Sequence, residues 1–336
     1  MKVVTIEKYG GPEVLAVRQI SEPEPERGQV SITVAAAGVN FADILARKGL
    51  YPDAPKLPAV VGYEVAGEVR KAGPGAHYQK GDRVLALTQF GGYGEVVAVP
   101  EEQVFPLPGN LSYSEAAAIP VNYLTAWQLG VMGGLTGDDT LLIHNIGGGV
   151  GLAALTIARH KGATVIGTAS ASKHDRLREF GCHHLIDYRT EDWVRRVREL
   201  TDGRGVDLVY DPQGGSGWKK SFSVLSKTGR LGMFGVSQVT ESRLPKALKF
   251  LPVLRHMPFY TPVQLMNSNK GVYGVNIGRL WGEKQKVKRW ADAILDGVRD
   301  GWIAPHVDAT FSFDQAAEAH RYIEERKNFG KVVLTF

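Results

Sequence analysis

The chain has 336 residues, of which 43% are hydrophobic and 22% charged, so it can bury two full-sized cores. Forty basic and 35 acidic residues give a formal net charge of +5, which permits a nucleic-acid or membrane partner without requiring one. A single cysteine, Cys182, excludes an intrachain disulfide and a multi-cysteine zinc site, and no apolar run reaches the ~18 residues of a membrane span. Because Glu7 lies where a signal peptide needs its apolar core, we expect a cytoplasmic α/β protein.

Short strands and turns are expected over the first third of the chain. Strand-like runs lie at 30–37, 63–72, 83–87 and 93–99, and glycine- and proline-rich turns separate them. Strands do not alternate with helices in this part, which favours a barrel-like β domain over a parallel sheet.

The pattern changes after a helix start expected at 112–118. Strands are predicted at 140–145, 163–168, 184–188, 206–211 and 230–235, with helices at 150–161, 191–200 and 217–225 between them. This alternation predicts a parallel sheet with helices on both faces, to which 272–277 adds a further strand. The chain then ends with helices at 283–300 and 315–327 and β structure at 306–313 and 331–336.

A glycine-rich turn between the strand at 140–145 and the following helix is the most informative stretch. Gly148, Gly149, Val150 and Gly151 let the backbone turn tightly and approach a pyrophosphate, whose charge a helix N-terminus favours. The strict spacing of the dinucleotide motif fails, because its third glycine would fall at Leu152. We therefore predict dinucleotide binding from the context, the alternative being an ordinary tight strand–helix connection.

The end of the next strand indicates which dinucleotide binds. An acidic residue is expected there to hold the ribose hydroxyls of NAD, but 168–174 contains Ser170 and Lys173 and no Asp or Glu precedes Asp175. Hydroxyls and a lysine would hold a 2′-phosphate that a carboxylate would repel. The segment therefore favours NADP(H), the alternative being a solvated loop.

Motifs spread along the chain resemble the zinc-independent quinone oxidoreductase group of the medium-chain dehydrogenase/reductase superfamily. They lie at 38–43, 49–51, 62–67, 81–84, 124–126, 148–151 and 187–188. Within that group, 168–174, 211–215 and 328–334 are most similar to the vesicle amine transport protein (synaptic vesicle membrane protein) branch. The resemblance implies a GroES-like catalytic domain from 1–122 and 266–336, a Rossmann NADP-binding domain at 123–265, and a homodimer through 272–277.

The resemblance also implies the reaction class. In the zinc enzymes of the superfamily, a cysteine and a histidine bind the catalytic metal at the positions of Asn40 and Tyr63, so we expect no metal here. The implied reaction is hydride transfer from NADPH to a quinone or an α,β-unsaturated carbonyl. A small quinone or enone is then the expected partner.

Four residues are candidates for the catalytic site. Asn40, Tyr51 and Tyr63 could donate a hydrogen bond to the carbonyl oxygen that gains charge, and Asp43 could orient them. Each also has a structural alternative: Asn40 caps a turn, Asp43 begins a helix and the tyrosines belong to the core. Leu45 replaces a tyrosine that relatives with quinone activity often have, which weakens the substrate assignment.

The cofactor residues are carried over from the resemblance. Gly148, Gly149, Val150 and Gly151 would hold the pyrophosphate, and Ser170, Lys173 and Tyr188 would surround the adenosine. Thr125 would open the helix that faces the nicotinamide, and Lys331 would reach into the cleft. The residues expected to flank the nicotinamide are Phe234, Gly235, Val236, Val275 and Asn276.

One segment carries the whole excess of positive charge. Residues 242–282 contain six basic and no acidic residues, which leaves 34 basic against 35 acidic residues elsewhere. Large apolar residues lie between these charges, a composition suited to an anionic lipid surface; a nucleic-acid partner is not expected. The alternative is a connection that lines the cleft and enters a dimer interface. The second functional hypothesis is thus a peripheral membrane-associated, vesicle-protein-like binding protein with a retained NADPH site and little turnover.

Overall fold

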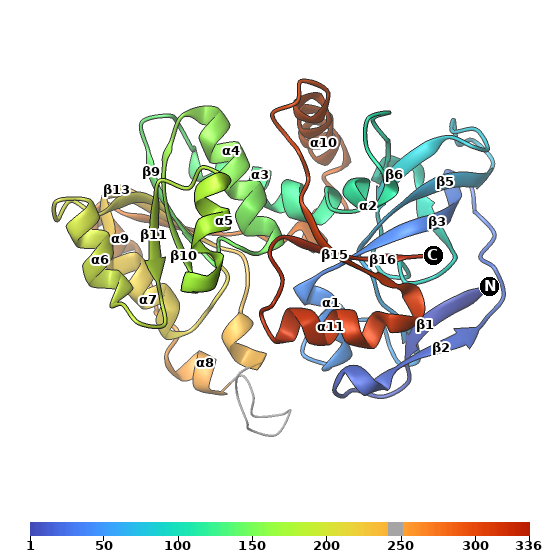
Figure 1. Ribbon diagram of the computed structural model, residues 1–336, viewed down its shortest axis with the longest axis horizontal. Coiled ribbons are helices and arrows are strands. Elements are labelled where there is room, and N and C mark those ends of the chain that lie inside the picture. Colours follow the sequence, from blue (N-terminus) through green and yellow to red (C-terminus); the bar gives the residue numbers. More distant parts are fainter. Residues whose placement is uncertain (241–250) are drawn as a thin grey trace. The chain divides into compact units, whose positions relative to one another are not determined.

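The computed structural model (Figure 1) describes residues 1–240 and 251–336, and it brings both ends of the chain into one unit. This first unit joins Met1–Leu124 to Gly278–Phe336, and the second unit is Thr125–Ile277. The second unit extends past the boundary expected at 265/266, because the strand at Gly271–Gly274 pairs with a strand of that unit.

The first unit is built on a mostly antiparallel sheet with the order β15–β16–β3–β5–β6–β8, in which β7 also pairs with β3. Figure 1 shows β16, from the red end of the chain, beside β3 from the blue end, and Val332 pairs with Val39 in their antiparallel register. The strands are β3 (Gln29–Val39), β5 (Glu64–Ala72), β6 (Arg83–Leu87), β7 (Val96–Pro100), β8 (Val104–Pro106), β15 (Val307–Ser312) and β16 (Lys331–Thr335).

A second, smaller sheet of the first unit was not predicted. It has the order β2–β1–β4, with β1 at Lys2–Ile6, β2 at Leu15–Gln19 and β4 at Ala59–Val60. Most of β2 is exposed, so its sequence lacks the apolar alternation that marks a half-buried strand.

Helices complete the first unit. They are α1 (Phe41–Arg47), α2 (Tyr113–Ala116), α10 (Lys284–Arg299) and α11 (Ala316–Glu324). Asn40 is the N-cap of α1, and the carboxylate of Asp43 accepts a hydrogen bond from the Asn40 backbone N–H at 2.8 Å. The structural alternatives for these two residues, a capped turn and a helix start, are thus both present.

The second unit contains the predicted parallel sheet, with the order β11–β10–β9–β12–β13–β14. The strands are β9 (Thr140–His144), β10 (Thr164–Ala169), β11 (His184–Asp187), β12 (Val206–Asp211), β13 (Leu225–Met233) and β14 (Gly271–Gly274), and every pairing between them is parallel. The chain runs outward from β9 in one direction and from β12 in the other. The strand order therefore reverses between β9 and β12, the place where open α/β sheets bind ligands.

The helices of this unit include those that the sequence predicted. They are α3 (Pro120–Gly133), whose residues 120–124 belong to the first unit, α4 (Gly149–Lys161), α5 (His174–Glu179), α6 (Trp193–Leu200), α7 (Ser216–Ser223), α8 (Leu251–Arg255) and α9 (Pro262–Ser268). Among the described residues, no helix combines the length and apolar character that crossing a bilayer requires.

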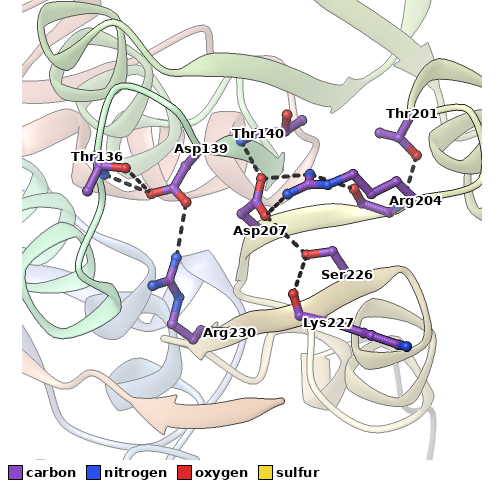
Figure 2. Close-up of polar contacts among 10 residues, drawn as sticks. Thr136, Asp139, Thr140, Thr201, Arg204, Asp207, Ser226, Lys227 and Arg230 are labelled. Carbon is purple, nitrogen blue, oxygen red and sulfur yellow. Dashed lines mark hydrogen bonds and ion pairs between the residues drawn. The ribbon is translucent and has the colours of Figure 1, made fainter. Parts of the chain in front are cut away.

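Ion pairs hold the amino ends of the parallel strands together (Figure 2). The guanidinium of Arg204 donates to both carboxylate oxygens of Asp207, at 2.6 and 3.0 Å, and Asp207 also accepts from the Thr140 backbone N–H at 2.9 Å. Arg230 donates to Asp139 at 3.2 Å. These contacts mark the amino edge of the sheet, whereas open parallel sheets bind their ligands at the opposite, carboxyl edge.

Candidate functional site

The glycine-rich turn lies at the carboxyl end of β9. Asn145 takes a left-handed conformation there (φ 54°), and Gly148 is the N-cap of α4. Gly149, Val150 and Gly151 form the first helical turn, whose backbone N–H groups have no acceptor within the helix. A Cβ atom on Gly151 would lie 2.5 Å from the carbonyl oxygens of Asn145 and Ile146, so only glycine lets the helix approach the strand this closely. The turn therefore fits a dinucleotide pyrophosphate.

The predicted adenosine residues follow the two neighbouring strands. Ser170 comes directly after β10 and is buried, with its hydroxyl 3.1 Å from that of Ser172. Lys173 ends the short 3₁₀ turn Ala171–Lys173 that follows, and Tyr188 comes directly after β11. Because parallel strands end at one edge, these residues lie on the same side of the sheet as the glycine-rich turn.

The predicted nicotinamide residues follow β13 and β14 at this same edge. Phe234, Gly235 and Val236 are half-buried after β13, and the Val275 N–H donates to the Met233 carbonyl at 2.8 Å. Asn276 is exposed beyond them. Thr125 is buried, but it lies inside α3, which begins at Pro120, so it does not open a helix as expected.

A buried polar cluster in the first unit surrounds Asn40. The ammonium group of Lys331 forms an ion pair with the carboxylate of Glu64 and donates to Asn40 Oδ1 at 2.7 Å. Asn40 Nδ2 donates to Glu64 Oε1 at 2.8 Å and to the Gly38 carbonyl at 3.4 Å, and Glu64 Oε2 accepts from the Val121 N–H at 2.7 Å. The amide of Asn40 is thus bound within the protein, with one of its two donated hydrogen bonds long and weak.

Lys331 is the predicted cofactor residue whose surroundings differ most from the expectation. Its ammonium group contacts Glu64 and Asn40, and its side chain is 3% exposed. The expected reach of Lys331 into a cleft is therefore replaced by an internal ion pair.

A second cluster is centred on Asp43. Its carboxylate accepts hydrogen bonds from the Asn40 N–H, from the Gly62 N–H at 3.0 Å and from the Tyr93 hydroxyl at 3.2 Å. Tyr93 in turn lies 3.1 Å from His320 Nε2. Burial raises the pKa of Asp43 to about 7, although the Asn40 hydrogen bond and the charge of Lys331 act in the opposite direction.

The two predicted tyrosines lie together. The rings of Tyr51 and Tyr63 meet edge to face with their centroids 5.8 Å apart, and Tyr63 also packs on Phe90 at 4.7 Å. Burial, and then a hydrogen bond with Tyr51, hold the pKa of Tyr63 well above its ordinary value. The phenol of Tyr63 therefore remains protonated at neutral pH, which a hydrogen-bond donor requires, and Tyr51 is the more exposed of the two.

Three residues of these clusters were not singled out from the sequence: Glu64, Tyr93 and His320. Glu64 interrupts a run of buried apolar residues in the 62–67 motif, and Lys331 similarly opens an apolar terminal strand. A buried charge is rarely left without a partner, so an acidic and a basic residue in two apolar strands could have been predicted to pair.

The cluster does not fit a zinc ion. Where the zinc enzymes have a cysteine ligand, the oxygen of Asn40 already accepts from the Lys331 ammonium group, and Tyr63 packs on aromatic rings. Within 1–240 and 251–336, no three His, Cys, Asp or Glu side chains are grouped so that they could hold a metal ion.

Known proteins resemble the chain over its whole length. A family model described as the alcohol dehydrogenase GroES-like domain matches residues 26–109, and one described as zinc-binding dehydrogenase matches 180–334. The rat synaptic vesicle membrane protein VAT-1 homolog is 37% identical over 99% of this chain and 84% of its own length. A quinone oxidoreductase of Pseudomonas aeruginosa is 35% identical over 99% of both chains. The crystal structure of Escherichia coli quinone oxidoreductase complexed with NADPH superposes with a TM-score of 0.88 at 28% identity, covering both chains fully.

Proposed function

The chain belongs to the medium-chain dehydrogenase/reductase superfamily, close to the quinone oxidoreductases and the VAT-1 homologues, and from this we propose that it is an NADPH-dependent, zinc-independent reductase of quinones or α,β-unsaturated carbonyls. The superfamily binds NADP(H), and the relatives share the predicted fold class, a GroES-like domain with a Rossmann-type parallel sheet. The observation that carries the proposal is the carboxyl edge of that sheet. There Ser170 and Lys173, rather than a carboxylate, follow β10, the strand beside β9 and its glycine-rich turn.

The chain's own residues would divide the work as follows. The first turn of α4 holds the pyrophosphate, and Ser170 and Lys173 hold the 2′-phosphate. When bound, NADPH supplies the hydride. The acceptor oxygen then gains negative charge, and a hydrogen bond from the protein stabilises it. Tyr51 is the leading donor because it is partly exposed, and the weakly held second N–H of Asn40 is the next.

A homodimer is part of this proposal. β14 is the last strand in the order of the parallel sheet, and its described pairing is with β13. An open strand edge offers unpaired backbone groups to a second chain. Sedimentation at micromolar concentration tests the dimer independently of activity.

Steady-state oxidation of NADPH over a panel of enals, enones and quinones tests the reductase activity. With at least one acceptor class, we expect NADPH to be oxidised at a rate proportional to the enzyme concentration. NADPH should be preferred over NADH as the hydride donor. Absence of turnover with every acceptor, in a preparation that binds NADPH, would remove the reductase assignment and keep the cofactor site.

A second candidate function rests on an exposed apolar surface in the second unit. Phe259 and Met266 are 85% and 78% exposed, and Val263 of the same segment is also exposed. Arg255 of the same segment is exposed as well, while Arg243, Lys246 and Lys249 of the basic segment lie outside the described residues. Exposed apolar groups next to positive charge suit an anionic lipid surface, which cosedimentation with phosphatidylserine vesicles tests.

A further inference from the structure

Four buried side chains are linked by hydrogen bonds beneath the carboxyl edge of the parallel sheet. Thr168 Oγ1 lies 3.0 Å from His144 Nδ1, His144 Nε2 lies 3.1 Å from Ser221 Oγ, and Ser221 Oγ donates to Asp211 Oδ2 at 2.6 Å. None of the four residues is more than 3% exposed. They come from β10, β9, α7 and β12, so the chain of hydrogen bonds ties the centre of the sheet to one of its covering helices.

The direction of these hydrogen bonds follows from the number of hydrogens available. The single hydrogen of the Ser221 hydroxyl is donated to Asp211, so Ser221 Oγ accepts from His144 Nε2–H. Burial lowers the pKa of His144, so its ring is neutral and Nδ1 carries no hydrogen. Nδ1 therefore accepts from the Thr168 hydroxyl, and each group has one defined role.

Asp211 connects this network to the loop at 212–215. Its second carboxylate oxygen, Oδ1, accepts from the Gln213 N–H at 2.6 Å, and its carbonyl accepts from the Phe234 N–H at 3.2 Å. The carbonyls of Pro212 and Gln213 accept from the backbone N–H groups of Ser237 and Gln238 at 2.9 and 3.0 Å. The loop therefore holds the segment 234–238, which contains three of the predicted nicotinamide residues.

The packing of this segment leaves little freedom. A Cβ atom on Gly235 would lie 2.9 Å from the carbonyl oxygen of Pro212, so the two backbones are in close contact. The loop at 212–215 also follows β12, directly beside β9 and its glycine-rich turn, where the strand order reverses. A change in the direction of the Asp211 carboxylate would thus be passed to 234–236.

We propose that Ser221 is a positioning residue which, through Asp211, sets the loop at 212–215 and holds 234–236 in place for the nicotinamide end of NADPH. This inference rests on the proposed NADPH site and adds to it a buried residue that does not touch the cofactor. Ser221→Ala leaves one carboxylate oxygen of Asp211 and the Nε2–H of His144 unpaired in the interior, which favours a reorientation of the Asp211 carboxylate and of the loop that it holds.

The chain offers a matched control in Ser226. Its hydroxyl donates to Asp207 at 3.1 Å, and it is buried in the same unit, but it lies at the amino edge of the sheet (Figure 2). Ser226→Ala therefore removes a comparable serine–aspartate hydrogen bond far along the strands from the predicted site. A merely structural role of Ser221 would give the two variants the same phenotype.

The test compares the binding of two probes to the full-length chain by fluorescence or calorimetric titration. For Ser221→Ala we expect the Kd of NADPH to rise about three- to tenfold, while that of adenosine 2′,5′-bisphosphate, which lacks the nicotinamide, stays unchanged. Ser226→Ala should leave both constants at the wild-type values. Ser221→Cys, which keeps the size of the side chain but hydrogen-bonds weakly, should give an intermediate Kd and serves if the alanine variant does not fold.

Each result has a defined meaning. An unchanged NADPH Kd in Ser221→Ala and Ser221→Cys, or an equal loss of affinity for the two probes in these variants, overturns the positioning role and leaves the proposed function intact. Wild-type protein that binds adenosine 2′,5′-bisphosphate but not NADPH, or binds neither, overturns the proposed function and the positioning role together.

Discussion

Lys331 and Glu64, which lie 267 residues apart in the chain, form an ion pair from which water is excluded: their side chains are 3% and 0% exposed. The pair joins the terminal strand β16 to β5 across β3, so it links the two ends of the chain that make up the first unit. Asn40 bridges the two charges with both ends of its amide. The first unit is therefore stabilised by the ammonium group of Lys331, which the terminal strand β16 contributes.

Lys331→Met should lower the free energy of unfolding by roughly 3–5 kcal/mol, because it leaves the Glu64 carboxylate buried without its counter-charge. Replacing both partners, with Lys331→Met and Glu64→Gln together, should recover part of this loss. Urea unfolding of the single and double variants measures the coupling between the two residues.

A surface pair provides the control for this prediction. Lys288 and Asp292 form an ion pair at 2.8 Å on α10, with side chains 67% and 47% exposed. Lys288→Met should change the free energy of unfolding by less than about 1 kcal/mol. A loss of similar size in Lys331→Met and Lys288→Met would contradict the prediction that the buried pair contributes more to stability than the exposed pair.

Gly38→Ala should disturb the same ion pair without changing a charge. A Cβ atom at this position would lie 2.5 Å from Glu64 Oε1 and 2.6 Å from both Lys331 Cε and the Ala117 carbonyl oxygen. Because the carbonyl belongs to the backbone, the cluster cannot yield by a simple side-chain rotation, and we expect a lower midpoint of thermal unfolding. Gly109→Ala, where a Cβ atom meets nothing within 4 Å, should leave that midpoint unchanged or slightly higher.

The second unit could be predicted closely from the sequence, because its signals are local. Each buried parallel strand is a short apolar run that a turn or helix follows, and the glycine-rich turn marks the start of α4. The predicted strand at 206–211 has the bounds of β12, Val206–Asp211. The position of Ser170 and Lys173 at the carboxyl edge of the sheet follows from the parallel order of the strands alone.

The first unit depends on contacts that a linear pattern does not contain. The pairing of Lys331 with Glu64 requires β16 to lie beside β3, which only the folded sheet determines. The same holds for Asn40, because the sequence does not reveal that its amide contacts both Lys331 and Glu64. Thr125 lies within α3 because the helix starts at a proline, whose fixed φ suits a first turn, and this start was not predicted.

Asp43 should give the protein a characteristic dependence of stability on pH. Burial is the main reason that folding raises the pKa of Asp43 from its ordinary value of 3.8 to about 7. At a pH between these two values, the folded chain therefore keeps a proton that the unfolded chain has lost. The contribution of Asp43 is thus complete below pH ~4 and is lost as the pH rises to about 7, with a slope of at most roughly 1.4 kcal/mol per pH unit.

Urea unfolding between pH 4 and 8 checks this sign. Asp43→Asn cannot titrate, so the difference in free energy between wild type and variant should shrink as the pH rises through this range. Asp314→Asn, an exposed acid of the same unit, should run parallel to wild type. A wild-type advantage that instead grows with pH would mean that Asp43 is stabilised as a carboxylate by its three hydrogen-bond donors.

Lys173 should decide between the two nicotinamide cofactors. It follows β10 beside Ser170, where NAD-binding sheets have an acidic residue, and an ammonium group there would pair with the 2′-phosphate that NADPH has and NADH lacks. Lys173→Ala should therefore raise the Kd of NADPH roughly tenfold or more and leave that of NADH nearly unchanged, because a charge-assisted hydrogen bond contributes about 1.5–3 kcal/mol.

Lys161→Ala, at the exposed carboxyl end of α4, removes the same charge from the same unit and should affect neither constant. The NADPH loss should also diminish at high salt, since screening weakens the ion pair in the wild type. Equal losses of affinity for NADPH and NADH in Lys173→Ala would instead mean that Lys173 only shapes the loop and that another group along the carboxyl edge distinguishes the two cofactors.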